Sequence, residues 1–146
     1  MNKLIYICSP FRGDYETNTQ KAIKYSAAAF AVGYIPITPH IYFPQFMNDR
    51  NPEEREKAMQ AGEELLLRCS EVWAFGLDHP SEGMSSEIAL AKKNGIPVRD
   101  GFEEILKHMT EVHMSGNVDE DALREFREKF KHVTAVALQV PEEVIL

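Results

Sequence analysis

Four short apolar segments, each separated from the next by enough chain for a helix, constrain the fold of this sequence most strongly. They are residues 4–8, 34–38, 71–75 and 96–98. The first of them, residues 4–8, is apolar throughout and rich in β-forming residues, which is typical of a strand buried on both faces of a parallel sheet. Strand–helix–strand units of this kind are joined by right-handed crossovers. We therefore predict an α/β fold, a doubly wound, mostly parallel sheet of four to five strands with helices on both faces.

Residues that start and stop helices stand between these strands. Asp14 and Asn51 are placed as N-caps, and Pro52 follows Asn51 at the first helical position. Gly33 and Gly95 are placed as C-terminal glycines. These signals predict helices over residues 15–32, 51–69 and 84–94. Residues 39–50 form a long, aromatic-rich connection, and loops of that length are often functional.

The rest of the chain is expected to extend a single domain of residues 1–146. Residues 102–113 and 119–132 are predicted helices within a C-terminal extension that covers residues 101–146. Residues 133–140 are either a last strand or a docking tail.

Composition excludes several classes of protein. The net charge is −7, which disfavours nucleic acid as a partner, because binding the phosphate backbone requires a basic face. There is no apolar run of about 18 residues and no signal-peptide pattern, so we expect no membrane partner and a cytoplasmic location. Cys8 and Cys69 lack metal or disulfide spacing and are expected to be reduced, buried thiols.

In an open parallel sheet of the flavodoxin or Rossmann-like kind, ligands bind beyond the carboxyl ends of the strands. This rule nominates residues 9–14, 40–46 and 76–87, which follow the first three strands.

Two carboxylates could carry chemistry. Glu87 is expected in the opening turn of its helix, where the helix dipole favours an ionised nucleophile, although an ordinary first-turn acid would look the same. Glu63 shares a helix face with Met59, Leu66 and Leu67, so it is expected to be partly buried and suited to a general acid. The alternative is a surface Glu63 paired with a nearby Arg or Lys.

An anion could be held after the first strand. Ser9, Arg12 and Gly13 combine a hydroxyl, a forked cation and a backbone that a ligand can approach closely. Ser81 and Ser85 could add hydroxyls from the third loop. A plain turn with an exposed Arg explains the same residues.

Aromatic residues and a histidine complete the candidate list. Tyr6 could offer its hydroxyl to the nucleophile, or it could be a core aromatic. His40 could contact a base or phosphate, or cap its loop. Tyr42, Phe43 and Phe46 could stack on a base or form a satellite cluster. No metal-ligand spacing stands out.

Together these motifs resemble the nucleoside 2-deoxyribosyltransferase superfamily, and most closely its (deoxy)nucleoside 5′-monophosphate N-glycosidase branch. The resemblance covers residues 3–99. Its blocks are residues 6–13 (YICSPFRG), 38–40 (TPH), Glu63 ahead of residues 69–72 (CSEV), and residues 81–89 (SEGMSSEIA). Glu63 stands where the family usually has Asp, and Ser85 where it has Gly.

The resemblance implies a hydrolase with Glu87 as nucleophile, Glu63 as acid and Tyr6 as the residue that positions Glu87. It implies substrate contacts from Ser9, Arg12, Gly13, His40, Ser81, Gly83 and Ser85. Ser81 occupies the position where the monophosphate hydrolases carry a phosphate-binding Ser and the transferases an Asp. The resemblance further implies a small-molecule nucleotide substrate, no metal, no cofactor and a homodimer. Two alternatives stay open: a non-catalytic nucleotide-binding sensor on the same fold, and a nucleoside deoxyribosyltransferase.

Overall fold

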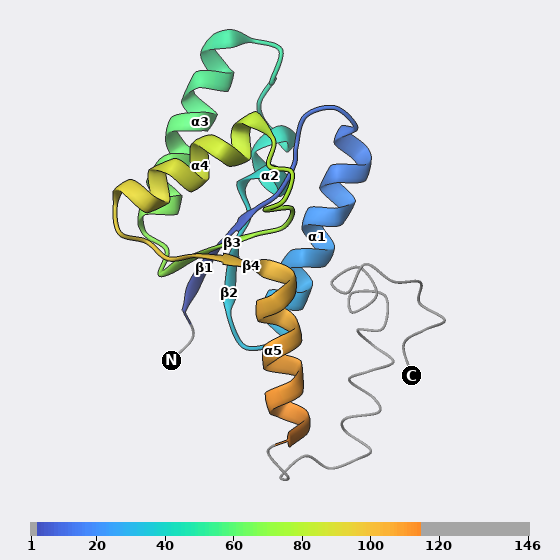
Figure 1. The fold of residues 1–146 in the computed structure, drawn as a ribbon. Helices are drawn as coiled ribbons and strands as arrows, with labels where there is room; N and C mark the ends of the chain where they lie inside the picture. Colours follow the sequence, from blue (N-terminus) through green and yellow to red (C-terminus); the bar gives the residue numbers. More distant parts are fainter. Residues whose placement is uncertain (1–2, 115–146) are drawn as a thin grey trace.

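The computed structural model describes residues 3–114, which form one sheet covered by helices (Figure 1). The sheet order is β2-β1-β3-β4 and every pairing is parallel. This confirms the predicted doubly wound α/β fold. The strand that contains Pro36 lies at the edge of the sheet, where a residue without a backbone N–H is tolerated. The elements are β1 (Leu4–Cys8), α1 (Tyr15–Ala31), β2 (Ile35–Ile37), α2 (Pro39–Tyr42), the 3₁₀ helix η1 (Phe43–Gln45), α3 (Pro52–Leu67), β3 (Glu71–Ala74), α4 (Glu82–Lys93), β4 (Val98–Asp100) and α5 (Gly101–Met114).

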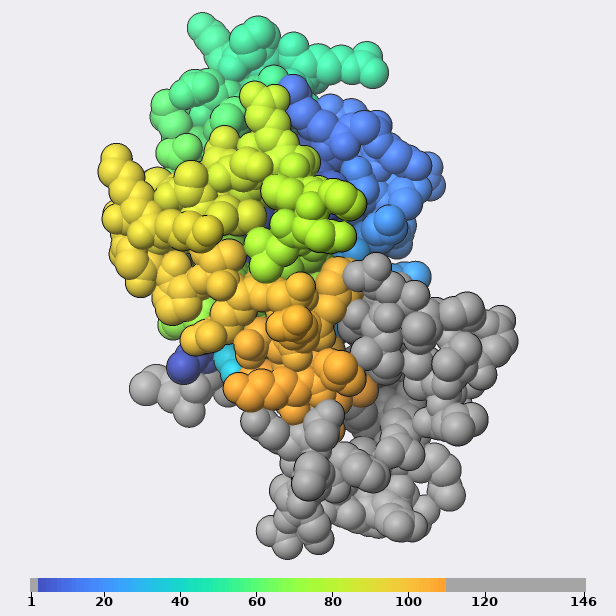
Figure 2. Space-filling view, viewed as in Figure 1, coloured from blue at the N-terminus to red at the C-terminus, as the bar shows by residue number. Residues whose placement is uncertain are grey.

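Alternate side chains of the two central strands enter two separate cores. Ile5, Ile7 and Trp73 pack with α1 and α5 on one face. Tyr6, Cys8, Val72 and Ala74 pack with α3 and α4 on the other. Because side chains of a strand point alternately to opposite faces, β1 and β3 need apolar residues at every position. Figure 2 shows that α4 and α5 both contribute to the molecular surface seen in that view.

The predicted helix ends agree with the structure at most caps. Asp14 Oδ1 accepts a hydrogen bond from Thr17 N, and Asn51 Oδ1 accepts from Glu53 N and Glu54 N. Gly33 and Gly95 follow helices with φ of +97° and +69°, a conformation that costs glycine little.

Three predicted segments differ clearly from the structure. α4 begins at Glu82, two residues before the predicted start, because Ser81 caps it by accepting from Met84 N at 3.2 Å. β4 covers Val98–Asp100, since Val98 is the residue that pairs with Val72. The predicted loop at residues 39–50 contains α2 and η1.

The buried face of α1 does not follow the positions of its large apolar residues. α1 buries Ala22, Tyr25, Ala28 and Ala29, whereas Ile23 is 41% and Phe30 70% exposed. The alanine run makes several faces of this helix equally apolar, so periodicity alone selects the face poorly.

Cys8 and Cys69 are buried free thiols, as predicted. No helix within residues 3–114 is long and apolar enough to span a membrane. The predicted elements at residues 119–132 and 133–140 lie outside the described residues.

Candidate functional site

The loop between β1 and α1 is held in a fixed shape by its own polar contacts. Asn18 Nδ2 donates to the carbonyl oxygens of Phe11 and Arg12, each at 3.2 Å. Gly13 has a φ of +103°, which side-chain-bearing residues rarely adopt. The loop therefore presents Ser9, Arg12 and the Gly13 backbone from the carboxyl end of β1.

Glu87 meets two other predicted site residues that are distant in sequence. Tyr6 Oη donates to Glu87 Oε1 at 2.8 Å, and His40 Nε2 lies 3.7 Å from the same oxygen. Tyr6 comes from β1, His40 from α2 and Glu87 from α4. The parallel topology places all three at the carboxyl edge of the sheet. Tyr6, His40 and Glu87 are called the Glu87 cluster below.

Burial and the Glu87 carboxylate keep the Tyr6 hydroxyl and the Cys8 thiol protonated. Burial, followed by the charge of Glu87, raises the pKa of Tyr6 well above its ordinary value. Burial and then Glu87 raise the pKa of Cys8 in the same way. Tyr6 is therefore a hydrogen-bond donor to Glu87, and Cys8 is an inert thiol, across the physiological pH range.

Three buried polar atoms of the described residues have no hydrogen-bond partner, and all three belong to predicted site residues. They are Ser9 Oγ, His40 Nδ1 and Glu87 Oε2. A buried polar group without a partner costs roughly 1–3 kcal/mol, so such groups are rare unless they serve a function. Their arrangement at the carboxyl edge favours a polar ligand that supplies the missing bonds.

His40 links the Glu87 cluster to the β1–α1 loop. Its ring stacks on Phe11 with a centroid separation of 5.2 Å and an interplanar angle of 15°. Phe11 also contacts Tyr15 edge to face at 4.9 Å. Stacking fixes the imidazole beside Glu87, whichever nitrogen carries the proton.

The start of α4 corrects the expected setting of Glu87. Because α4 begins at Glu82, Glu87 lies in the second turn and not in the opening turn. The helix dipole acts mainly within the first turn, so Tyr6 is the stronger influence on Glu87. Ser81 caps the helix through its Oγ, and Gly83 and Ser85 are exposed near the start of the helix.

Glu63 is not buried as expected. It is exposed, and the apolar stripe on which that expectation rested is only partly buried, because Met59 is 49% and Leu67 41% exposed. Glu63 forms no hydrogen bond or ion pair within residues 3–114, and Arg68 pairs instead with Glu64 at 3.7 Å. The neighbouring residue Gly62 lies against Tyr6, since a Cβ on Gly62 would lie 3.7 Å from Tyr6 Oη.

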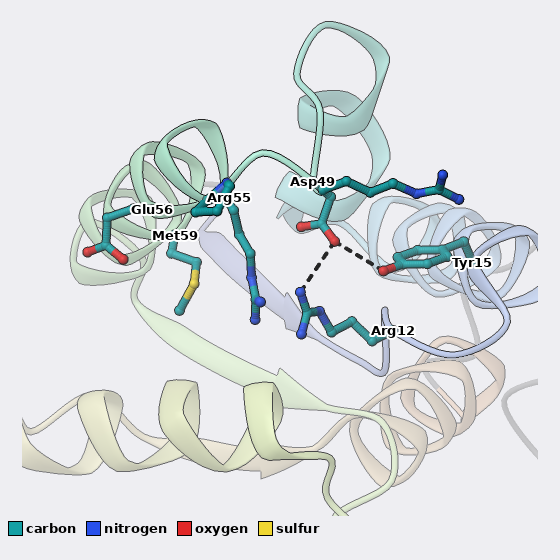
Figure 3. Close-up of a pocket in the computed structure, with 8 residues that line it drawn as sticks. Arg12, Tyr15, Asp49, Arg55, Glu56 and Met59 are labelled. Atoms are coloured by element: carbon teal, nitrogen blue, oxygen red, sulfur yellow. Dashed lines mark hydrogen bonds and ion pairs between the residues drawn. The ribbon is translucent and has the colours of Figure 1, made fainter.

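A pocket of about 460 Å³ lies between the β1–α1 loop and α3 (Figure 3). Asp49 Oδ2 lies 3.6 Å from Arg12 Nη2 and accepts from Tyr15 Oη at 3.0 Å. The pocket is lined by Arg12, Tyr15, Asp49, Arg50, Pro52, Arg55, Glu56 and Met59.

Most of these lining residues are absent from the sequence-based prediction. Residues 52, 55, 56 and 59 form one helical face, which is a signal that could have been read from the spacing. Glu63 is four residues beyond Met59 and so continues this face of α3. The path of the loop that brings Asp49 to Arg12 had no sequence signal.

The predicted aromatic residues stack on one another. Ring centroids are 4.8 Å apart for Tyr42 and Phe43, and 5.6 Å apart for Phe43 and Phe46. Phe46 is 69% exposed, so this cluster retains an open aromatic face. Residues 3–114 contain no group of three or more acidic, His or Cys side chains able to hold a metal ion.

Comparisons with known proteins give one match. No curated protein and no solved structure matches the chain. A family model described as a domain of unknown function, DUF7768, matches residues 3–101, which run from β1 to the first residue of α5. The chain therefore belongs to the DUF7768 family.

Proposed function

We propose that the protein is a hydrolase that cleaves the N-glycosidic bond of a (deoxy)nucleoside 5′-monophosphate through a covalent intermediate on Glu87. One observation carries the proposal. Glu87 Oε1 is held by Tyr6, whereas Oε2 is buried and has no partner. An oriented carboxylate with one unengaged oxygen at a ligand-binding edge suits attack on a sugar carbon. The resemblance to the nucleoside 2-deoxyribosyltransferase superfamily supports the same role.

The reaction has two steps. Glu87 Oε2 forms a bond to the anomeric carbon as the bond between that carbon and the base nitrogen breaks, and the electron pair leaves with the base. Glu63 donates the proton that the departing base requires. A water molecule then attacks the anomeric carbon, Glu87 is released, and the proton of the water returns to Glu63.

The position of Glu63 supports this part in the reaction. It continues the face of α3 that lines the pocket, and the adjacent Gly62 lies against Tyr6. Retaining glycosidases hold their two carboxyl groups about 5 Å apart, so binding of the sugar is expected to draw Glu63 towards Glu87.

The β1–α1 loop is the proposed phosphate site. Ser9 Oγ is buried and unpartnered, and the side chain of Arg12, three residues further along the loop, is 54% exposed. The Ser81 hydroxyl accepts from Met84 N and therefore keeps its own O–H to donate to an oxyanion.

The test is base release from a panel of ribo- and deoxyribonucleoside 5′-monophosphates. Glu87→Gln should lower kcat about a thousandfold or more, because it removes the nucleophile. Glu63→Gln should lower kcat by about a hundredfold, as expected for loss of a general acid. Glu64→Gln, one residue along the same exposed stretch of α3, is the control and should retain full activity. Equal background release by wild type and Glu87→Gln would overturn the proposal.

A nucleotide-binding sensor without turnover is a second candidate, favoured by the exposed Glu63. It predicts a rise in Tm with nucleotides and no free base after long incubation. Base transfer between two nucleosides, undiminished in Arg12→Ala, would instead indicate a free-nucleoside transferase.

A further inference from the structure

We propose that the pocket between the β1–α1 loop and α3 binds a second phosphate group, so that the protein prefers nucleoside 5′-diphosphates to nucleoside 5′-monophosphates. The inference rests on the proposed function, because Arg12 holds the first phosphate there. It extends the proposed substrate, because the sequence suggests a nucleotide with one phosphate and the pocket suggests a second.

The first observation is the excess of unpaired cations in the pocket. Arg12, Arg50 and Arg55 all line it. Within residues 3–114, the guanidinium groups of Arg50 and Arg55 form no hydrogen bond or ion pair. Guanidinium groups bind phosphate through two parallel N–H donors, and they repel one another when no anion lies between them.

The second observation is the direction of two of these side chains. Figure 3 shows Arg12 and Arg55 extending towards one another from opposite walls of the pocket. Arg12 comes from the β1–α1 loop, which the proposed function assigns to the first phosphate. Arg55 comes from the first turn of α3. A second phosphate, attached to one that lies beside Arg12, would therefore lie on the Arg55 side of the pocket.

The carboxylates of the pocket do not neutralise it. Asp49 is the partner of Arg12, but the separation is 3.6 Å and Arg12 is 54% exposed, so the pair is weak. Tyr15 holds the same oxygen of Asp49, which keeps this carboxylate at one side of the pocket. Glu56 accepts from Gln60 along α3 at 2.9 Å. Two carboxylates against three guanidinium groups leave one positive charge for an anion.

The size of the pocket agrees with more than one phosphate. Its volume of about 460 Å³ lies within the range of about 300–1,000 Å³ that small-molecule sites occupy. The chain as a whole carries a net charge of −7, so this basic pocket is a local feature and not part of a general polyanion-binding surface.

The experiment compares dissociation constants for matched nucleoside 5′-mono- and diphosphates by calorimetry, over ribo- and deoxyribonucleotides of the common bases. The wild type should bind the diphosphate at least about tenfold more tightly for the preferred base. Arg55→Gln should remove most of this difference. Arg68→Gln is the matched control, since it removes one Arg at the other end of α3, where Arg68 pairs with Glu64.

The outcomes separate the two proposals. Equal affinity of the wild type for mono- and diphosphates overturns the second phosphate site. This comparison uses the wild type alone, so it does not depend on whether a variant folds. A diphosphate preference that survives both Arg55→Gln and Arg50→Gln also overturns it. A preference for diphosphates without base release would support this site and contradict the proposed hydrolase. Base release from monophosphates without a preference for diphosphates would support the hydrolase and contradict this site. Absence of any nucleotide binding would contradict both.

Discussion

The two oxygens of the Glu87 carboxylate are in different environments. Oε1 receives the Tyr6 hydroxyl and faces His40, while Oε2 is buried without a partner. This asymmetry orients the carboxylate before any ligand arrives. Preorganised groups of this kind stabilise a transition state at little further cost in free energy.

Tyr6→Phe tests whether the hydroxyl positions Glu87. A hydrogen bond to a charged group contributes roughly 1.5–3 kcal/mol, so kcat should fall by about ten- to a hundredfold while KM changes little. The measurement is steady-state base release. Tyr25→Phe is the control, because Tyr25 is buried in the core on the other face of the sheet. A Tyr6→Phe enzyme that changes KM alone would contradict a positioning role.

Cys69 makes the stability depend on alkaline pH. Burial raises its pKa from the ordinary value of 9.0 to about 11. Between these pH values the unfolded thiol loses its proton and the folded thiol keeps it, so the free energy of unfolding falls as the pH rises. Cys69→Ala should show a fall smaller by on the order of 2 kcal/mol between pH 9 and 11, measured by urea denaturation. The raised pKa values of Tyr6 and Cys8 also lower the stability at alkaline pH, and they do so equally in the wild type and in Cys69→Ala. Parallel profiles of unfolding free energy against pH for the two proteins would therefore show that Cys69 makes no contribution.

At the scale of the element, α5 docks on the sheet through a close approach at its first residue. Gly101 is buried, and a Cβ there would overlap the ring of Phe75, which stacks on Tyr25 with centroids 4.1 Å apart. The absence of a side chain at position 101 is therefore what allows α5 to begin directly at the end of β4.

Gly101→Ala should lower the free energy of unfolding by about 1–3 kcal/mol, the usual cost of forcing an extra carbon into a packed core. Gly83→Ala is the matched control, since nothing lies within 4 Å of its Cβ position in α4. Alanine is the better helix former, so that variant should be unchanged or stabilised by up to about 1 kcal/mol. Chemical denaturation compares the two. Equal effects would contradict the close packing of Phe75 on Gly101.

Helix starts were predictable where the sequence offered a single well-marked N-cap residue. Asp14 and Asn51 cap their helices as expected, and Pro52 at the first helical position distinguishes Asn51 from the nearby Asn48 and Asp49. The start of α4 was not predictable in this way, since Ser81, Ser85 and Ser86 all lie near it and each could be a cap. In the structure Ser81 is the cap, and this places Glu87 in the second turn.

At the scale of the whole molecule, parallel topology assembles the candidate site. Tyr6, His40 and Glu87 lie far apart in the sequence, and their meeting follows from the rule that the carboxyl ends of parallel strands share one edge. This part was predictable because it depends on strand order. The contact of Asp49 with Arg12 was not, since the path of residues 43–51 depends on packing that local patterns do not encode. Glu63 was misplaced for the same reason: its stripe looked apolar, but the sheet covers only part of it.

The most direct test of the account is detection of the covalent intermediate. The wild type would be mixed with its preferred nucleotide and quenched in acid during turnover. Mass spectrometry of the digested protein would then locate any adduct. The account predicts a sugar-phosphate adduct on the peptide that contains Glu87, and no adduct in Glu87→Gln. Turnover at full rate without an adduct on that peptide, or an adduct that persists in Glu87→Gln, would contradict it.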